Sequence, residues 1–266
     1  MLLAFLDECN PEPNNQHSPE NRFLIFGVTL IDSSVSLEFN EGVDEIRQQH
    51  GFNRTDKLKY ALADKPDHVT NEQHREAKAA VLELAARLNV KTILYCALHR
   101  IIDSQGQDTY LNWGMDACLT KIQQFYTENE AENGFFCFFD RHSRQTMPQY
   151  MKTKFQERNH QPRAGHRTPN LVGVSQVWDG TSHLSSLCDI VTGSYAYVVS
   201  NPDRDIAGKS LVRLLKPMVW GISVDDGQFD VMDRGLLFRP EQRNPRFDVH
   251  YEEVRSRVVD WANEPA

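Results

Sequence analysis

Two aspartates each follow a short apolar run, and carboxylates in such positions are candidates for binding a metal ion. Residues 2–6 read Leu-Leu-Ala-Phe-Leu before Asp7, and residues 135–139 read Phe-Phe-Cys-Phe-Phe before Asp140. Such runs are typical of buried strands, which places each aspartate at a strand end. If the strands are neighbours, the two carboxylates require a proton, a cationic side chain or a hard cation such as Mg²⁺. Each aspartate alone could instead cap a turn or a helix.

The third candidate is Asp189, which lies in a segment with helical periodicity, residues 182–199. One stripe of this helix is apolar, and a second consists of small residues in which Asp189 is the only charge: Ser182, Ser186, Gly193 and Ala196. Small residues let a helix approach a neighbouring backbone closely, so we expect Asp189 to lie beside another element. The alternative is an exposed aspartate between two half-buried faces.

The elements that would position these aspartates follow an α/β pattern. We expect strands at residues 2–6, 23–31, 35–39, 91–98, 135–139 and 171–177, with one or two weak strands between 229 and 238. We expect helices at 43–49, 70–89, 110–127, 147–158, 182–199, 206–215 and 251–262. An opening antiparallel β-meander followed by βα units favours an α/β protein with helices packed on a mixed sheet. This is the order of a ribonuclease H-like fold, although other mixed α/β folds share it.

Bulk properties favour one soluble, cytoplasmic domain. The chain has 266 residues, 40% of them hydrophobic, and a formal net charge of −8. We expect a single domain over residues 1–266, with 200–266 as a C-terminal extension. No segment is long enough to span a membrane, and the N-terminus does not resemble a secretory signal. The five cysteines include no CxxC pair, which predicts reduced and mainly buried thiols. Walker, GxSxG and GxGxxG motifs are also absent from the sequence.

Four segments, in order, resemble a bacterial family catalogued as domain of unknown function 3800. Leu-Asp-Glu-Cys-Asn at residues 6–10 is similar to its strand followed by Asp-Glu-Ser-Gly, with Cys-Asn replacing Ser-Gly. Thr55-Asp56-Lys57 lies where the family has an acid, more often Glu, followed shortly by Lys. The apolar strand that ends at Asp140, and the stretch 175–193 around Asp189, complete the resemblance, which covers about residues 1–200.

The resemblance implies a ribonuclease H-like fold and a metal-dependent nuclease that hydrolyses phosphodiester bonds. Asp7, Asp56, Asp140 and Asp189 fall on the family's acidic positions and would hold two Mg²⁺ or Mn²⁺ ions ~4 Å apart. One ion would activate water, and the other would stabilise the leaving oxygen. Lys57 would orient Asp56 or contact a phosphate. The basic segment 158–167 could guide a nucleic acid, DNA or RNA, although the sequence favours a solvated loop there.

Two other functions are open from the sequence. The first is a ribonuclease H-like module that binds nucleic acid or protein without cutting, which separated carboxylates or one diverted into a salt bridge would favour. The second is a phosphohydrolase acting on small nucleotides, which a closed pocket beside the acids would favour. The sequence leaves open the choice between DNA and RNA and the oligomeric state.

Overall fold

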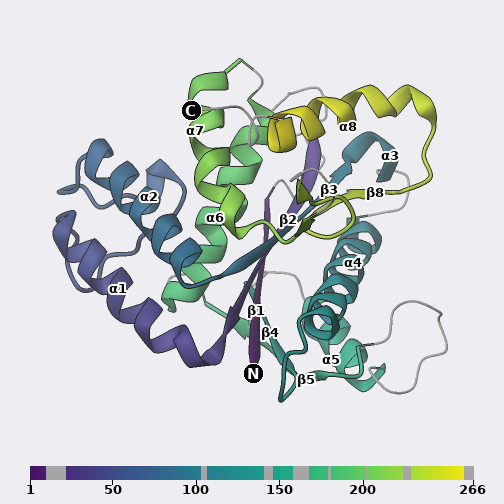
Figure 1. Ribbon diagram of the computed structural model, residues 1–266, viewed down its shortest axis with the longest axis horizontal. Helices are drawn as coiled ribbons and strands as arrows, with labels where there is room; N and C mark the ends of the chain where they lie inside the picture. The colour runs from purple at the N-terminus through teal and green to yellow at the C-terminus, as the bar shows by residue number, and fades with distance from the viewer. Residues whose placement is uncertain are drawn as a thin grey trace.

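A six-stranded mixed sheet runs through the centre of the computed structural model (Figure 1). The structure describes residues 1–9, 22–102, 107–140, 146–157, 168–178, 181–201, 203–223 and 229–260. The strand order is β5-β4-β1-β2-β3-β8. Their bounds are β1 Leu2–Cys9, β2 Phe23–Asp32, β3 Lys91–Leu98, β4 Phe135–Asp140, β5 Leu171–Val177 and β8 Leu236–Arg239. β1, β2 and β3 pair antiparallel, whereas β4 joins β1, β5 joins β4 and β8 joins β3 in parallel.

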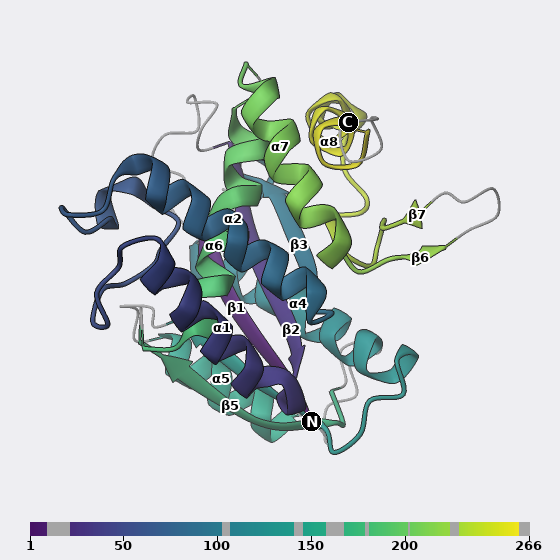
Figure 2. The same ribbon diagram turned by 60° about the vertical axis from the view of Figure 1, so that its left-hand side comes forward.

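Helices cover both faces of this sheet, which explains why its central strands are almost continuously apolar. Nine of the ten residues of β2 are buried. One face carries α1 Ser36–Gln49, α2 Asn71–Arg87, α6 His183–Ser200, α7 Asp205–Leu215 and α8 Asp248–Arg255 (Figure 2). The other face carries α4 Gln107–Glu128 and α5 Thr146–Glu157. The short helix α3 His99–Ile102 follows β3, and β6 Ile222–Ser223 pairs with β7 Phe229–Asp230 as a small ribbon. The α/β class with helices on a mixed sheet is therefore confirmed.

The predicted strand at residues 35–39 is wrong, because these residues enter helix α1. Phe39, Val43 and Arg47 recur every fourth residue and are buried together on one helix face. The preceding turn is capped by Asp32, whose Oδ1 accepts a hydrogen bond from the Ser34 N–H at 2.8 Å. The third antiparallel strand is instead β3, which enters after α1 and α2.

The helix predicted at residues 70–89 is confirmed, and the structure shows a capping box at its start. The Thr70 N–H donates to Gln73 Oε1 at 2.9 Å, and the Gln73 N–H donates to Thr70 Oγ1 at 3.1 Å. The prediction of reduced and mainly buried cysteines also agrees, since all five are free thiols and only Cys9 is partly exposed.

The segment after residue 200 contributes to the same sheet and core. β8 extends the sheet beyond β3, and Leu236 and Leu237 are fully buried. The buried Tyr251 of α8 fastens this segment, because its hydroxyl donates to the Arg239 carbonyl at 2.8 Å and accepts from the Leu98 N–H at 2.9 Å. Within the described ranges, no helix combines the length and the apolar character that crossing a membrane requires.

Candidate active site

Asp7 and Asp140 lie side by side where two parallel strands stop pairing. The last paired residues of β1 and β4 are Leu6 and Phe139, and each aspartate is the next residue of its strand. Two residues earlier, on the same face of the sheet, the rings of Phe5 and Phe138 stack with centroids 4.6 Å apart. The expected adjacency of the two strands is therefore confirmed. Asp140 is the last residue of β4, whereas β1 continues beside β2 to Cys9, two residues beyond Asp7.

Helix α6 crosses the sheet next to these strand ends and brings Asp189 to them. Gly27 pairs with Asp7 across β1 and β2, and a Cβ atom at Gly27 would lie 2.1 Å from Thr192 Oγ1. The Cys188 thiol donates to the Phe5 carbonyl at 3.2 Å. A glycine and a cysteine thus let α6 approach the strands closely, and Asp189 is the residue after Cys188.

The small-residue stripe of α6 lies against another element, as predicted. The Tyr60 N–H donates to Asp189 Oδ2 at 2.6 Å, which fixes the carboxylate. One turn later, a Cβ atom at Gly193 would lie 2.2 Å from Tyr60 Cγ, so only glycine leaves room for the tyrosine ring. The alternative of an exposed Asp189 between two half-buried faces is therefore wrong.

The three carboxylates interact electrostatically. The pKa of the Asp7 carboxyl is well above its ordinary value, first because the group is buried and then because the charges of Glu8, Asp189 and Asp140 disfavour its ionisation. A hydrogen bond from the Glu8 N–H to Asp7 Oδ1, 2.9 Å long, partly opposes this effect. The site therefore concentrates negative charge in surroundings that solvate it poorly.

The lysine beside these acids is Lys59 rather than the predicted Lys57. Its Nζ lies 3.8 Å from Asp189 Oδ1, and its side chain is largely buried. Lys57 is exposed, and the buried Leu58 separates the two lysines. A second lysine, Lys78, braces the same segment, since its Nζ donates to the Tyr60 carbonyl at 2.8 Å and lies 4.5 Å from the centroid of the Tyr60 ring. The only sequence signal for Lys59 is the Lys-Leu-Lys alternation.

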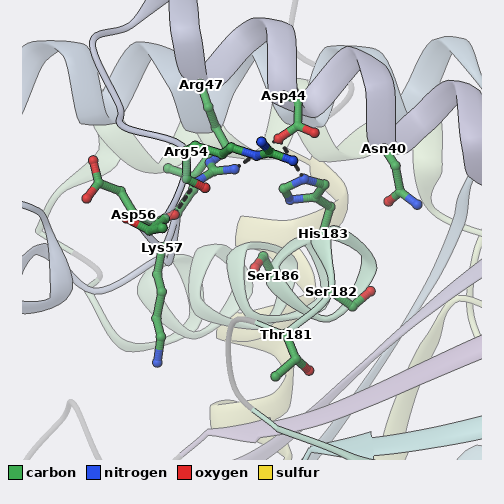
Figure 3. A pocket seen from close by; sticks show the side chains of 12 residues that line it. Asn40, Asp44, Arg47, Arg54, Asp56, Lys57, Thr181, Ser182, His183 and Ser186 are labelled. Carbon is green, nitrogen blue, oxygen red and sulfur yellow. Dashed lines mark hydrogen bonds and ion pairs between the residues drawn. The ribbon is translucent and has the colours of Figure 1, made fainter.

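Asp56 is not brought to the other three aspartates. Its Oδ2 accepts a hydrogen bond from the Asn53 N–H at 2.5 Å and lies 3.0 Å from His68 Nε2. The side chains of Asp56 and Lys57 extend in different directions in Figure 3, so Lys57 does not orient the Asp56 carboxylate there. The fourth acidic position implied by the resemblance is thus occupied by a residue with its own local partners.

A pocket of about 560 Å³ lies beside the N-terminus of α6 (Figure 3). Three segments line it: α1, the loop around residues 54–58 and the first turn of α6. Asp44 of α1 links two of them, because its Oδ1 lies 3.0 Å from both Arg47 Nη1 and His183 Nε2. The basic segment 158–167, together with Arg141 and His142, lies outside the described residues.

The donor chemistry of Asp7, Asp140 and Asp189 fits a hard divalent cation, which prefers carboxylate oxygens. Their mutual repulsion is the electrostatic state that a cation would relieve. In the parts of the chain that the structure describes, however, no three His, Cys, Asp or Glu side chains are arranged to hold a metal ion. The chain matches no protein-family model, no curated protein and no solved structure.

Proposed function

We propose that this protein is a metal-dependent nuclease whose reaction centre is formed by Asp7, Asp140 and Asp189. The observation that carries the proposal is the convergence of three aspartates, from two adjacent parallel strands and one helix, at a single edge of the sheet. The topology supports it, because an antiparallel β1-β2-β3 arrangement with β4 and β5 added in parallel beside β1 accords with the ribonuclease H-like fold that the sequence resemblance implies.

The residues around the aspartates hold them in place. The Tyr60 N–H fixes one oxygen of Asp189, and the Lys59 ammonium stands near the other. The Glu8 N–H fixes one oxygen of Asp7. Asp7, Asp140 and Asp189 are not arranged as a metal site in this structure and would have to draw together to hold Mg²⁺ or Mn²⁺. The ion when bound would supply an activated water and neutralise charge on the phosphodiester. Lys59 contributes a positive charge in the same region, where it partly balances the carboxylates.

The proposed ligands differ from those that the sequence resemblance implies, a four-acid site in which Asp56 joins Asp7, Asp140 and Asp189. Asp56 would have to leave both His68 and the Asn53 N–H to reach the three aspartates. Breaking a charge-assisted hydrogen bond costs about 1.5–3 kcal/mol. We therefore assign Asp56 to the support of its loop, and Lys59 rather than Lys57 to the acidic cluster.

The test is cleavage of single-stranded and duplex DNA and RNA by purified protein with Mg²⁺, Mn²⁺ or EDTA. Asp7→Asn and Asp140→Asn should each abolish cleavage while leaving the circular dichroism spectrum unchanged. Asp205→Asn is the matched control, because Asp205 is exposed in the first turn of α7 and its bond to the Ile206 N–H survives the change to an amide. Undiminished cleavage by either site variant would contradict the proposal.

A second candidate, a ribonuclease H-like module that binds without cutting, is favoured by the pairing of Asp56 with His68. It predicts that wild-type protein binds nucleic acid equally in EDTA and in Mg²⁺ or Mn²⁺ and leaves every substrate intact. Asp7→Asn would then leave binding unchanged. Cleavage that requires a divalent cation and Asp7 would exclude this candidate.

A further inference from the structure

We propose that the pocket at the N-terminus of α6 binds a backbone phosphate of single-stranded nucleic acid, while the exposed indole of Trp178 stacks on a base of the same strand. This inference rests on the proposed nuclease function and names the substrate class of that site. It draws on two features: the pocket lined by Arg54, Lys57 and the start of α6, which is the helix that carries Asp189, and the end of strand β5, which pairs with Asp140.

The pocket presents cationic side chains because Arg47 shapes its wall. Arg47 is only 6% exposed, and its guanidinium donates to the carbonyls of Asn53 and Arg54, each at 3.2 Å, and to that of Asp56. Its charge is balanced by Asp44 at 3.0 Å. Arg47 therefore holds the loop around residues 53–58 in place. This loop positions the exposed side chains of Arg54 and Lys57 at the pocket.

Asp56 also lines the pocket, but its carboxylate has partners of its own. It is engaged by His68 and the Asn53 N–H and extends away from Lys57 (Figure 3). The pocket thus combines two exposed cations with hydroxyl groups from Thr55, Thr181 and Ser182. This combination suits a phosphate group, which accepts hydrogen bonds from cationic and hydroxyl donors alike.

The start of α6 adds to the positive potential of this pocket. Ser182 caps the helix by accepting a hydrogen bond from the Leu184 N–H at 3.2 Å, and His183 and Ser186 line the pocket. The N-terminus of an 18-residue helix carries a partial positive charge, which attracts phosphate. Arg54, Lys57, the hydroxyl groups and the helix dipole therefore favour an anion at this position, whereas the carboxylates of Asp44 and Asp56, which also line the pocket, oppose it.

The spacing along α6 fits a strand that passes from the pocket to the aspartates. A helix rises about 1.5 Å per residue, so Ser186 lies about 4.5 Å and His183 about 9 Å along the axis from Asp189. These lengths correspond to about one or two nucleotides of an extended strand. A phosphate in the pocket would therefore hold the neighbouring phosphodiester near Asp189.

Trp178 lies at the end of β5, next to the strand that carries Asp140. It follows Val177, which pairs with Asp140 across β5 and β4, and it is 62% exposed. The Trp178 carbonyl accepts hydrogen bonds from the N–H and Oγ1 of Thr181, at 3.0 and 2.6 Å, and Thr181 also lines the pocket. Indole faces stack well on unpaired bases, whereas the base faces in a duplex are already covered. The aromatic group therefore favours a single strand.

The test is fluorescence anisotropy with labelled 12-mer oligonucleotides in EDTA, which separates binding from cleavage. The probes are single-stranded DNA, single-stranded RNA and duplex DNA of one sequence, with a 5′-nucleoside monophosphate as competitor. Arg54→Glu and Lys57→Glu should each weaken binding of the single strands at least about fivefold and lower the slope of log affinity against log salt by about 0.7. Trp178→Ala should weaken binding by a similar factor and leave the slope unchanged.

Two matched controls lie elsewhere on the molecule. Arg87→Glu makes the same charge change at the end of α2. Strand β3 begins just after it, at the end of the sheet that lies opposite the aspartates. Trp113→Ala removes a 48% exposed tryptophan from α4, on the other face of the sheet. Both controls should bind single strands within about twofold of wild type.

Several outcomes would overturn the inference: site and control variants that weaken binding equally, duplex bound as tightly as single strand, or full competition by the mononucleotide at concentrations near those of the oligonucleotide. A wild-type protein that binds none of the probes would overturn it too. If cleavage requires Asp7 and Asp140 but the Arg54, Lys57 and Trp178 variants bind normally, this inference fails while the proposed function stands. If these variants lose binding but Asp7→Asn still cleaves, the proposed function fails instead.

Discussion

The backbone N–H of Tyr60 donates a hydrogen bond to Asp189 Oδ2 at 2.6 Å, and this contact joins helix α6 to the loop that precedes α2. The residue before Tyr60 is Lys59, whose ammonium lies near the other oxygen of Asp189. The orientation of Asp189 therefore depends on how this loop is placed. The loop is placed by Arg47 at one end and by Lys78, which binds the Tyr60 carbonyl, at the other.

Lys59 and Lys57 should differ in their effects on cleavage. Lys59→Ala removes the ammonium that lies 3.8 Å from Asp189 Oδ1, so kcat should fall about 10- to 100-fold, as for partners that orient metal ligands. Lys57→Ala should raise KM for single strands and leave kcat nearly unchanged, because Lys57 lies at the pocket. Steady-state kinetics of both variants separate the two roles. Equal losses of kcat in both would contradict the assignment of Lys59.

Asp7→Asn should stabilise the protein in EDTA at neutral pH. Because the pKa of Asp7 is raised in the folded state, ionising it lowers the free energy of unfolding as the pH rises above the ordinary value of 3.8. The neutral Asn avoids this loss, so its Tm should exceed that of wild type, by about 2–4 °C for each kcal/mol recovered. The difference should vanish below pH 3.8, where aspartate is protonated in both states.

Adding Mg²⁺ provides the complementary measurement on the same pair of proteins. A cation that binds the folded state raises its Tm, so wild type should gain stability and Asp7→Asn should gain little. Scanning calorimetry with and without Mg²⁺ measures both effects. A Tm for Asp7→Asn below that of wild type at pH 7 in EDTA would show that the Asp7 charge is well compensated in the fold.

The grouping of Asp7, Asp140 and Asp189 follows from local sequence patterns. An apolar run before an aspartate marks a buried strand, which ends at Asp140 in β4 but continues to Cys9 in β1. The small residues around Asp189 mark a helix face that approaches another backbone closely. Both patterns extend over only a few neighbouring residues, so they can be recognised in a single sequence. The structure adds the strand order, in which β4 lies next to β1, and this order brings Asp7 and Asp140 together.

The choice between Lys57 and Lys59 depends on contacts that no local pattern reveals. The path of residues 53–60 is set by Arg47, which reaches three carbonyls of this loop from helix α1. The helix expected at residues 43–49 contains Arg47, but Phe39 falls in the segment expected to be a strand, so the buried face formed by Phe39, Val43 and Arg47 is not evident from the sequence. The pairing of Asp56 with His68 is likewise a contact between loop residues without periodicity.

Gly27→Ala should destabilise the fold by displacing α6 from the strands. The new methyl group would lie 2.1 Å from Thr192 Oγ1, in a buried contact that cannot relax freely. We expect a loss of about 1–3 kcal/mol in the free energy of unfolding, typical of overpacking. Thr192→Ala in the same chain should restore part of it, which urea unfolding of the double-mutant cycle measures. Gly42→Ala is the control, since it meets only the flexible end of Leu84; a similar loss there would contradict the argument.

Asp56→Asn should retain cleavage within about fivefold of wild type, because the Asp56 carboxylate is held by His68 and the Asn53 N–H rather than by the acidic cluster. The amide oxygen can still accept from Asn53, so the loop loses mainly its interaction with His68, worth about 0.2–1 kcal/mol at an exposed site. His68→Ala should destabilise the protein by a similar amount and leave Mg²⁺ dependence unchanged. Activity assays at several Mg²⁺ concentrations test whether Asp56 binds the metal ion. A loss as complete as that of Asp7→Asn, accompanied by a higher Mg²⁺ requirement, would make Asp56 a metal ligand and restore the four-acid site.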